Sequence, residues 1–105
     1  MIDKNKIFNN LAYIESMNQN GACPNLDEYW EEIVDMLSKD LEETRKFLNE
    51  DCNEHKIWYM AGYYEDISYK FQSHEFINIL EELENKYPNI DIKQDIQWAK
   101  DAVDD

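Results

Sequence analysis

Carboxylates are the side chains of this sequence that could most readily do chemistry, because two paired acids can act as general acid and general base. Glu65 and Asp66 are neighbours, so on a helix their side chains point about 100° apart and do not converge. Glu31 and Asp35 share a helical face, but no arginine, serine or glycine-rich stretch beside them completes a catalytic pocket. The sequence also lacks Ser-His-Asp, Cys-His and phosphate-loop signatures. We therefore predict no catalytic residues and no enzymatic activity.

Two cysteines and two histidines are the other candidates for ligand chemistry. Cys52 and His55 stand three residues apart, and Cys23 and His74 could complete four zinc ligands. This spacing matches no zinc motif, and the acidic residues lack the spacing of a calcium loop. We predict reduced thiols, no metal and no cofactor.

Acidic residues gather between Asp27 and Glu54, where eleven of them stand against three basic residues. Like charges four residues apart, such as Asp27 and Glu31 or Glu31 and Asp35, each destabilise a helix by about 0.2–0.5 kcal/mol. A surface that serves only solubility mixes its signs, although a plain solvated face remains an alternative. We interpret the stripe as a docking surface for a strongly basic protein. Its predicted contact residues are Glu28, Glu31, Glu32 and Asp35.

The stretch from Glu54 to Gln72 is the element around which we expect the fold to be organised. At helical spacing, one of its faces is suited to a core. That face holds Ile57, Met60, Ala61, Tyr64, Ile67, Ser68 and Phe71. The opposite face carries rings and carboxylates, which fits either a central helix enclosed by neighbours or a binding surface. The residues predicted to bind on this face are Trp58, Tyr59, Tyr63, Glu65, Asp66 and Tyr69.

The rest of the chain also reads as helix, because it has two glycines, two prolines and no sustained alternation of apolar and polar residues. We predict an all-α fold, a single compact bundle of five or six short helices over residues 1–105. The predicted helices cover about residues 3–17, 26–37, 40–50, 54–72, 74–87 and 92–103, and whether the second and third are continuous is left open. Asn25, Ser73 and Asp91 are the expected N-caps. Gly62 costs its helix about 1 kcal/mol relative to alanine, and we expect close approach of a neighbouring helix to be the reason.

The bulk properties restrict the partners. With 24 acidic and 10 basic residues among 105, the chain carries a net charge of −14. Such a charge argues against binding nucleic acid or an anionic membrane, because both are polyanions. The sequence shows no signal-like segment and no run of 18 apolar residues, so we expect a cytoplasmic protein that is a monomer or weak homo-oligomer when free.

The segment from Trp58 through Ala99 resembles a known family. It reads WYMAGYYEDISYKFQSHEFINIL, then LENKYPNID, then DIQWA. The residues that carry the likeness are Asp66, Ile67, Ser68, Gln72, Ser73, Phe76, Tyr87 and Pro88. This pattern is similar to small bacterial toxin-immunity proteins of contact-dependent growth inhibition and related polymorphic-toxin systems. The resemblance implies a cytoplasmic antidote that binds one cognate toxin domain, commonly a nuclease, and blocks its active site.

Charge and resemblance together predict an immunity protein that occludes a basic toxin, an RNase or DNase, without touching nucleic acid itself. An acidic regulator or DNA mimic that inhibits a host nucleic-acid enzyme is an alternative, and it requires charges spaced like phosphates along an elongated surface. An adaptor subunit whose outward aromatic rings are buried in a homo-oligomer is another.

Overall fold

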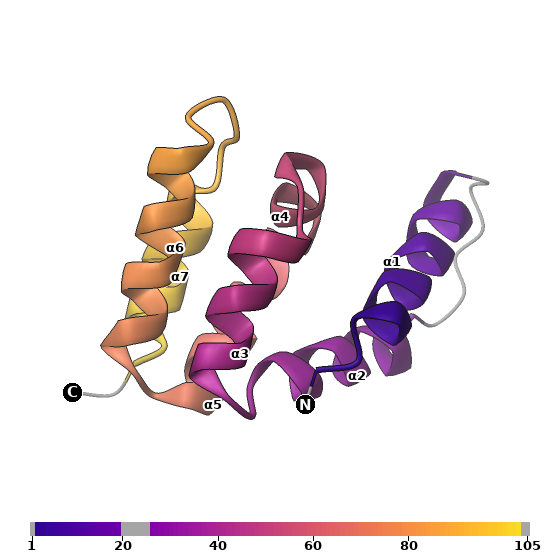
Figure 1. The fold of residues 1–105 in the computed structure, drawn as a ribbon, viewed down its shortest axis with the longest axis horizontal. Coiled ribbons are helices and arrows are strands. Elements are labelled where there is room, and N and C mark those ends of the chain that lie inside the picture. Colours follow the sequence, from indigo (N-terminus) through magenta and orange to yellow (C-terminus); the bar gives the residue numbers. More distant parts are fainter. Residues whose placement is uncertain (1, 20–25, 104–105) are drawn as a thin grey trace.

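The helices follow the periodicity of the sequence. The computed structural model describes residues 2–19 and 26–103, and no strand occurs among them (Figure 1). The α-helices are α1 (Lys4–Gln19), α2 (Asp27–Leu37), α3 (Leu41–Lys46), α4 (Glu54–Met60), α5 (Tyr64–Phe71), α6 (His74–Lys86) and α7 (Lys93–Asp101). A π-helical turn, η1 (Phe47–Asp51), extends α3, and a 3-10 turn, η2 (Ala61–Tyr63), joins α4 to α5. The predicted all-α bundle is confirmed.

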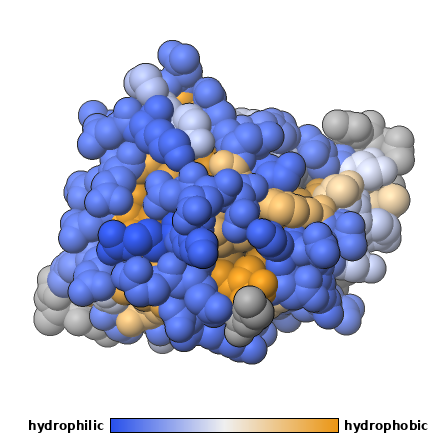
Figure 2. All heavy atoms as spheres, in the orientation of Figure 1, coloured by the Kyte–Doolittle hydropathy of each residue, from blue (hydrophilic) through white to orange (hydrophobic). Residues whose placement is uncertain are grey.

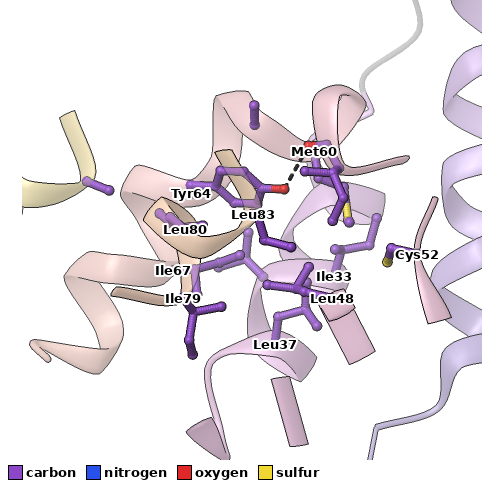
Figure 3. Packing of buried hydrophobic residues seen from close by; sticks show 14 of the residues in the cluster. Ile33, Leu37, Leu48, Cys52, Met60, Tyr64, Ile67, Ile79, Leu80 and Leu83 are labelled. Atoms are coloured by element: carbon purple, nitrogen blue, oxygen red, sulfur yellow. Dashed lines mark hydrogen bonds between the residues drawn. The ribbon is translucent and has the colours of Figure 1, made fainter. Parts of the chain in front are cut away.

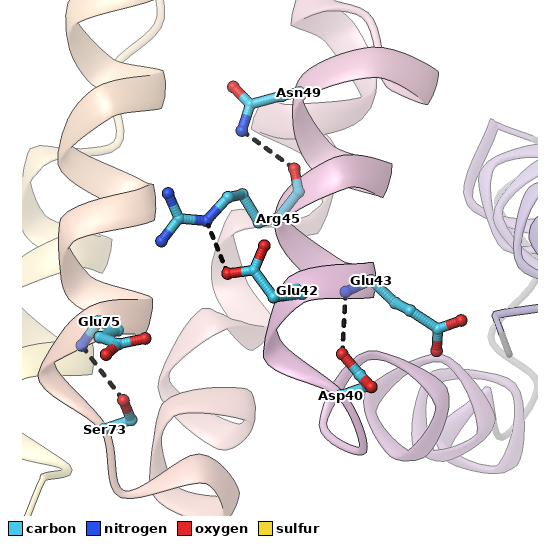
Figure 4. Close-up of polar contacts among 7 residues, drawn as sticks. All are labelled: Asp40, Glu42, Glu43, Arg45, Asn49, Ser73 and Glu75. Atoms are coloured by element: carbon cyan, nitrogen blue, oxygen red, sulfur yellow. Dashed lines mark hydrogen bonds and ion pairs between the residues drawn. The ribbon is translucent and has the colours of Figure 1, made fainter.

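Side-chain caps begin several of these helices. Asp40 and Ser73 each accept a hydrogen bond from a backbone N–H of the first turn that follows, at 3.0 and 3.2 Å (Figure 4). Asn53 does the same at the start of α4, at 2.9 Å. The Asp40 cap makes α3 a helix separate from α2, and the Ser73 cap confirms the prediction for α6. Each such cap stabilises a helix start by about 1 kcal/mol.

The predicted cap of the last helix is wrong. Helix α7 begins at Lys93 with Ile92 at its N-cap position and no side-chain cap, so Asp91 lies one residue too early. Ile92 is fully buried, and packing of this apolar side chain decides where the helix starts. The expected cap of α2, Asn25, lies outside the described residues, and Leu26 occupies the N-cap position of that helix without a side-chain cap.

The helix predicted over residues 54–72 is broken. It ends at Met60, tightens into η2 and resumes at Tyr64. The predicted core face nevertheless holds, since all its members are buried except the half-buried Phe71. The close helix contact expected at Gly62 is wrong, because a β-carbon built there would meet no atom within 4 Å.

Polar groups inside the core are hydrogen-bonded. The fully buried Tyr64 donates its hydroxyl to the carbonyl of Ile57 at 2.7 Å, which ties α5 to α4 (Figure 3). The Ser68 hydroxyl donates to the carbonyl of Ala99 at 2.7 Å and ties α5 to α7. Burying either group unpaired would cost about 1–3 kcal/mol, so these bonds fix the position of α5.

The helices pack so that α2 and α5 meet. Helix α1 lies against α2, α6 and α7 lie side by side, and α5 packs against both α7 and α2 (Figure 1). The molecule measures 39 × 29 × 25 Å. Hydrophilic side chains cover most of the face in Figure 2, with hydrophobic atoms visible in the creases between them. The contact of α2 with α5 places the acidic stripe beside the ring-bearing segment.

Candidate functional site

Helices α2 and α5 enclose a groove of about 570 Å³, which we call the α2–α5 groove. From α2 it is lined by Asp27, Trp30, Glu31, Val34 and Asp35. From η2 and α5 it is lined by Tyr63, Asp66, Tyr69 and Lys70. Residues three and four apart lie on one face of a helix, and this spacing aligns both lining sets. Two helix faces that are far apart in the sequence therefore form one surface.

The floor of the groove is aromatic. Trp30 and Tyr63 stack with ring centroids 4.0 Å apart and planes 13° apart. Trp30 is only 8% exposed, so its indole serves both the core and the groove. Partial burial raises the pKa of Tyr63, and the nearby carboxylates of Asp27 and Asp66 raise it further. The phenol therefore stays protonated at neutral pH and can donate a hydrogen bond.

The walls of the groove carry more negative than positive charge. Lys70 lies 2.6 Å from the Asp35 carboxylate, and its hydrogen bond lowers the pKa of Asp35. Glu31 and Asp66 have no cation within ion-pair distance in the part of the chain that the structure describes. Lys70 is the one basic residue among the lining side chains. The groove is thus an open, ring-floored cleft suited to a cationic group.

Five of the ten predicted contact residues meet at this groove, namely Glu31, Asp35, Tyr63, Asp66 and Tyr69. Tyr69 is the most accessible of its rings, with 66% of its surface exposed. Tyr63 is half-buried, so the choice between core and binding surface resolves differently for the two tyrosines. Half of the predicted set is therefore brought together.

The other predicted acidic residues lie elsewhere. Glu32 pairs with Lys6 of α1 at 3.0 Å, so its carboxylate joins α1 to α2, and it does not line the groove. Glu28 and Glu65 are exposed, and neither lines the groove. A stripe read along one helix cannot separate these positions, because the helix packed against it decides which side is covered.

The predicted aromatic residues of α4 form the continuation of this surface. Tyr59 is half-buried, with its ring centroid 6.1 Å from that of Trp30. Trp58 is 51% exposed, and its centroid lies 6.4 Å from that of Tyr59 in an edge-on arrangement. The rings of Tyr63, Trp30, Tyr59 and Trp58 thus follow one another from the groove onto α4.

Sequence reasoning missed four groove residues, which are Asp27, Trp30, Val34 and Lys70. In the sequence, Trp30 and Val34 read as core residues. They nevertheless alternate along α2 with the acidic row of Asp27, Glu31 and Asp35. Lys70 stands four residues after Asp66. Where an apolar row borders an acidic row on one helix, the apolar residues lie at the edge of the core. This pattern could have identified Trp30 as a groove residue.

Cys52 offers no reactive group to any site. Its thiol is buried, and burial raises the pKa to about 12. His55 lies 2.9 Å from the carboxylate of Glu15, across from α1. The two side chains proposed as a zinc pair are thus occupied separately, one by the core and one by an acidic neighbour. Cys23 lies outside the described residues.

Comparison with other proteins leaves the groove as the main guide to function. Neither the models of protein families, nor the curated proteins, nor the solved structures yield a match to this chain. Within residues 2–19 and 26–103, no helix has both the length and the apolar character needed to cross a bilayer.

Proposed function

We propose that this protein is an immunity protein that binds a cognate basic toxin domain, a nuclease, and occludes its active site. The observation that carries the proposal is the α2–α5 groove, where Glu31 and Asp66, which form no ion pair with any described residue, lie beside exposed and stacked tyrosine rings. The similarity of residues 58–99 to toxin-immunity proteins supports the same class. We place its action in the cytoplasm, without metal, cofactor or direct contact with nucleic acid.

Charge is the first part of the proposed mechanism. A chain of net charge −14 attracts a cationic protein over several ångströms, and such steering accelerates association well above the neutral rate of about 10⁵–10⁶ M⁻¹s⁻¹. A nuclease holds its substrate through cations that contact phosphates. Carboxylates of the groove can take the positions of those phosphates, so that substrate and inhibitor exclude each other.

Aromatic contact is the second part. Tyr69 exposes most of its ring in the free protein, and a partner that covers it gains a buried aromatic anchor. The Trp30–Tyr63 stack is already formed, so its rings lose little freedom when the partner binds. Exposed Tyr69 and the rigid floor therefore favour slow dissociation, whereas the charges favour fast association.

The test uses a candidate toxin, the basic C-terminal domain of any large secreted protein whose reading frame adjoins the gene of this chain, which we call the neighbouring basic domain. Calorimetry would compare the wild type with a groove variant, Asp27→Asn with Glu31→Gln and Asp66→Asn. A control variant, with Glu50, Glu82 and Glu84 each replaced by glutamine, removes the same number of charges from other parts of the surface. We expect the groove variant to bind at least about 100-fold more weakly and the control to stay within about threefold.

Growth rescue gives the functional readout. Cells that express the toxin domain should survive with wild-type protein or the control variant and die with the groove variant. Equal affinity of all three proteins, or full rescue by the groove variant, would refute the proposed site. Absence of any binding to the neighbouring domain would refute the immunity function.

A further inference from the structure

Nothing in the described part of the chain requires glycine at position 62. It lies in η2, its φ is outside the left-handed region, and a β-carbon built on it would meet no atom within 4 Å. Glycine in a helical segment is less favourable than alanine by about 0.5–1 kcal/mol, because the unfolded chain loses more freedom. Neither backbone geometry nor internal packing offsets that cost.

The space above Gly62 is a second hollow, of about 400 Å³, which we call the Gly62 hollow. Its lining residues are Trp30, Trp58, Tyr59, Ala61, Gly62 and Asp95. Trp58 exposes half of its surface beside it. Asp95 of α7 supplies a carboxylate that has no cation within ion-pair distance in the described part of the chain. Partial burial raises the pKa of Asp95, and Asp91 adds to that rise.

The Gly62 hollow continues the α2–α5 groove. Trp30 lines both, so the two adjoin at its side chain. Trp58 also lines a third hollow, together with Glu54 and Asp91. Among the residues that line the groove and these two hollows, carboxylates outnumber lysines, and Lys70 is the one lysine. One acidic, ring-bearing surface therefore runs from α2 across η2 to α7.

We propose that the Gly62 hollow is a second contact for the cationic partner, whose chain approaches η2 more closely than a β-carbon at position 62 permits. This inference rests on the proposed immunity function and extends its contact surface to Trp58 and Asp95. A lysine or arginine of the partner pairs with Asp95 and lies over the Trp58 ring, where a cation and an indole attract each other. A second copy of this chain fits poorly, because a twofold contact would set the same carboxylates against each other.

The experiment fills the hollow without disturbing the fold. Gly62→Ala and Gly62→Gln in the full chain would be compared with Asn78→Gln, which places the same side chain at an exposed position on α6. We expect Gly62→Ala to raise Tm by about 2–5 °C. Gly62→Gln should keep the wild-type circular dichroism and Tm, yet bind the neighbouring basic domain at least about tenfold more weakly. Asn78→Gln should bind as the wild type does.

Each other outcome overturns a stated part of the argument. If the groove variant loses binding while Gly62→Gln binds normally, the Gly62 contact is wrong and the immunity function stands. A lower Tm for Gly62→Ala would assign the glycine to folding and would also reject the contact. Sedimentation that shows a wild-type dimer lost in Gly62→Gln would assign the hollow to self-association. If the neighbouring domain binds neither the wild type nor any variant, both proposals fail.

Discussion

Neutralising Glu31 should stabilise the free protein while weakening its complex. Glu31 lies between Asp27 and Asp35 at four-residue spacing on α2 and has no cation within ion-pair distance among the described residues. Glu31→Gln removes two like-charge pairs, each worth about 0.2–0.5 kcal/mol. Lys70 already offsets part of the charge of Asp35, so we expect a gain of about 0.5 kcal/mol. For a chain of this length the gain raises Tm by about 2–4 °C.

The same substitution should weaken the complex. A partner cation about 8 Å from the Glu31 carboxylate, at an effective dielectric constant of about 40, gains about 1 kcal/mol from it. Its loss corresponds to about a fivefold increase in Kd. The two effects have opposite signs because the free protein experiences repulsion from Asp27 and Asp35, whereas the complex supplies the missing attraction.

Urea unfolding at about 20 mM and about 500 mM NaCl measures the first effect, because screening at high salt should remove most of the gain. Calorimetry with the neighbouring basic domain measures the second. Glu82→Gln is the control, since it removes one exposed charge of α6 that stands four residues before Lys86. That control should not stabilise the protein. A destabilised Glu31→Gln, a gain that persists in high salt, or an unchanged Kd would each refute the reasoning.

Three further substitutions or reactions test other parts of the structure. Asp95→Asn should raise the free energy of unfolding at pH 7, because folding raises the pKa of Asp95 and so disfavours its charged form. Urea titrations at several pH values should show the full difference between variant and wild type above the folded pKa. The difference should vanish below the unfolded pKa near 3.8, where the carboxyl is protonated in both states. Cys52, with a pKa of about 12, should react with a thiol reagent in Cys23→Ser protein only when urea unfolds the chain. Tyr64→Phe should lower the free energy of unfolding by about 1 kcal/mol in urea titrations, since the Ile57 carbonyl loses its 2.7 Å hydrogen bond.

The sequence predicted the fold well where the chain obeys one local rule. Ile7, Leu11 and Ile14 recur at helical spacing, and all three are buried on α1. Ser73 caps α6 as predicted, because its short side chain places the hydroxyl where the Glu75 N–H donates to it. The apolar face of residues 54–72 is buried despite the break in the helix. The spacing of apolar residues alone determines which face is buried. The prediction of the buried face therefore holds even though the helix is interrupted at η2.

Features that depend on a partner element could not be predicted in the same way. The break at η2 has no proline or polar signal, and Gly62 alone indicates it. Glu32 and Glu31 are equivalent in the sequence, but Lys6 of α1 takes Glu32 into an ion pair and leaves Glu31 at the groove. Trp30 reads as core until the position of α5 shows that its ring also forms the floor of the groove.

The distribution of charge supports a binding surface more strongly than its total does. Lys4, Lys6 and Lys100 pair with Asp51, Glu32 and Glu81 at 3.0–3.2 Å, away from the groove. Arg45 lies near Glu42 on α3 (Figure 4), and neither of these residues lines the groove.

By contrast, three unfavourable features share the surface from α2 to α7: the like charges around Glu31, the glycine at position 62, and the partly buried Asp95, which forms no ion pair with any described residue. A requirement for solubility alone would scatter such costs over the molecule, because every exposed charge contributes to it. The proposed cationic partner would offset all three at once, since it would neutralise the carboxylates and fill the space above Gly62. Substitutions that relieve these features should therefore stabilise the free chain and weaken the same complex.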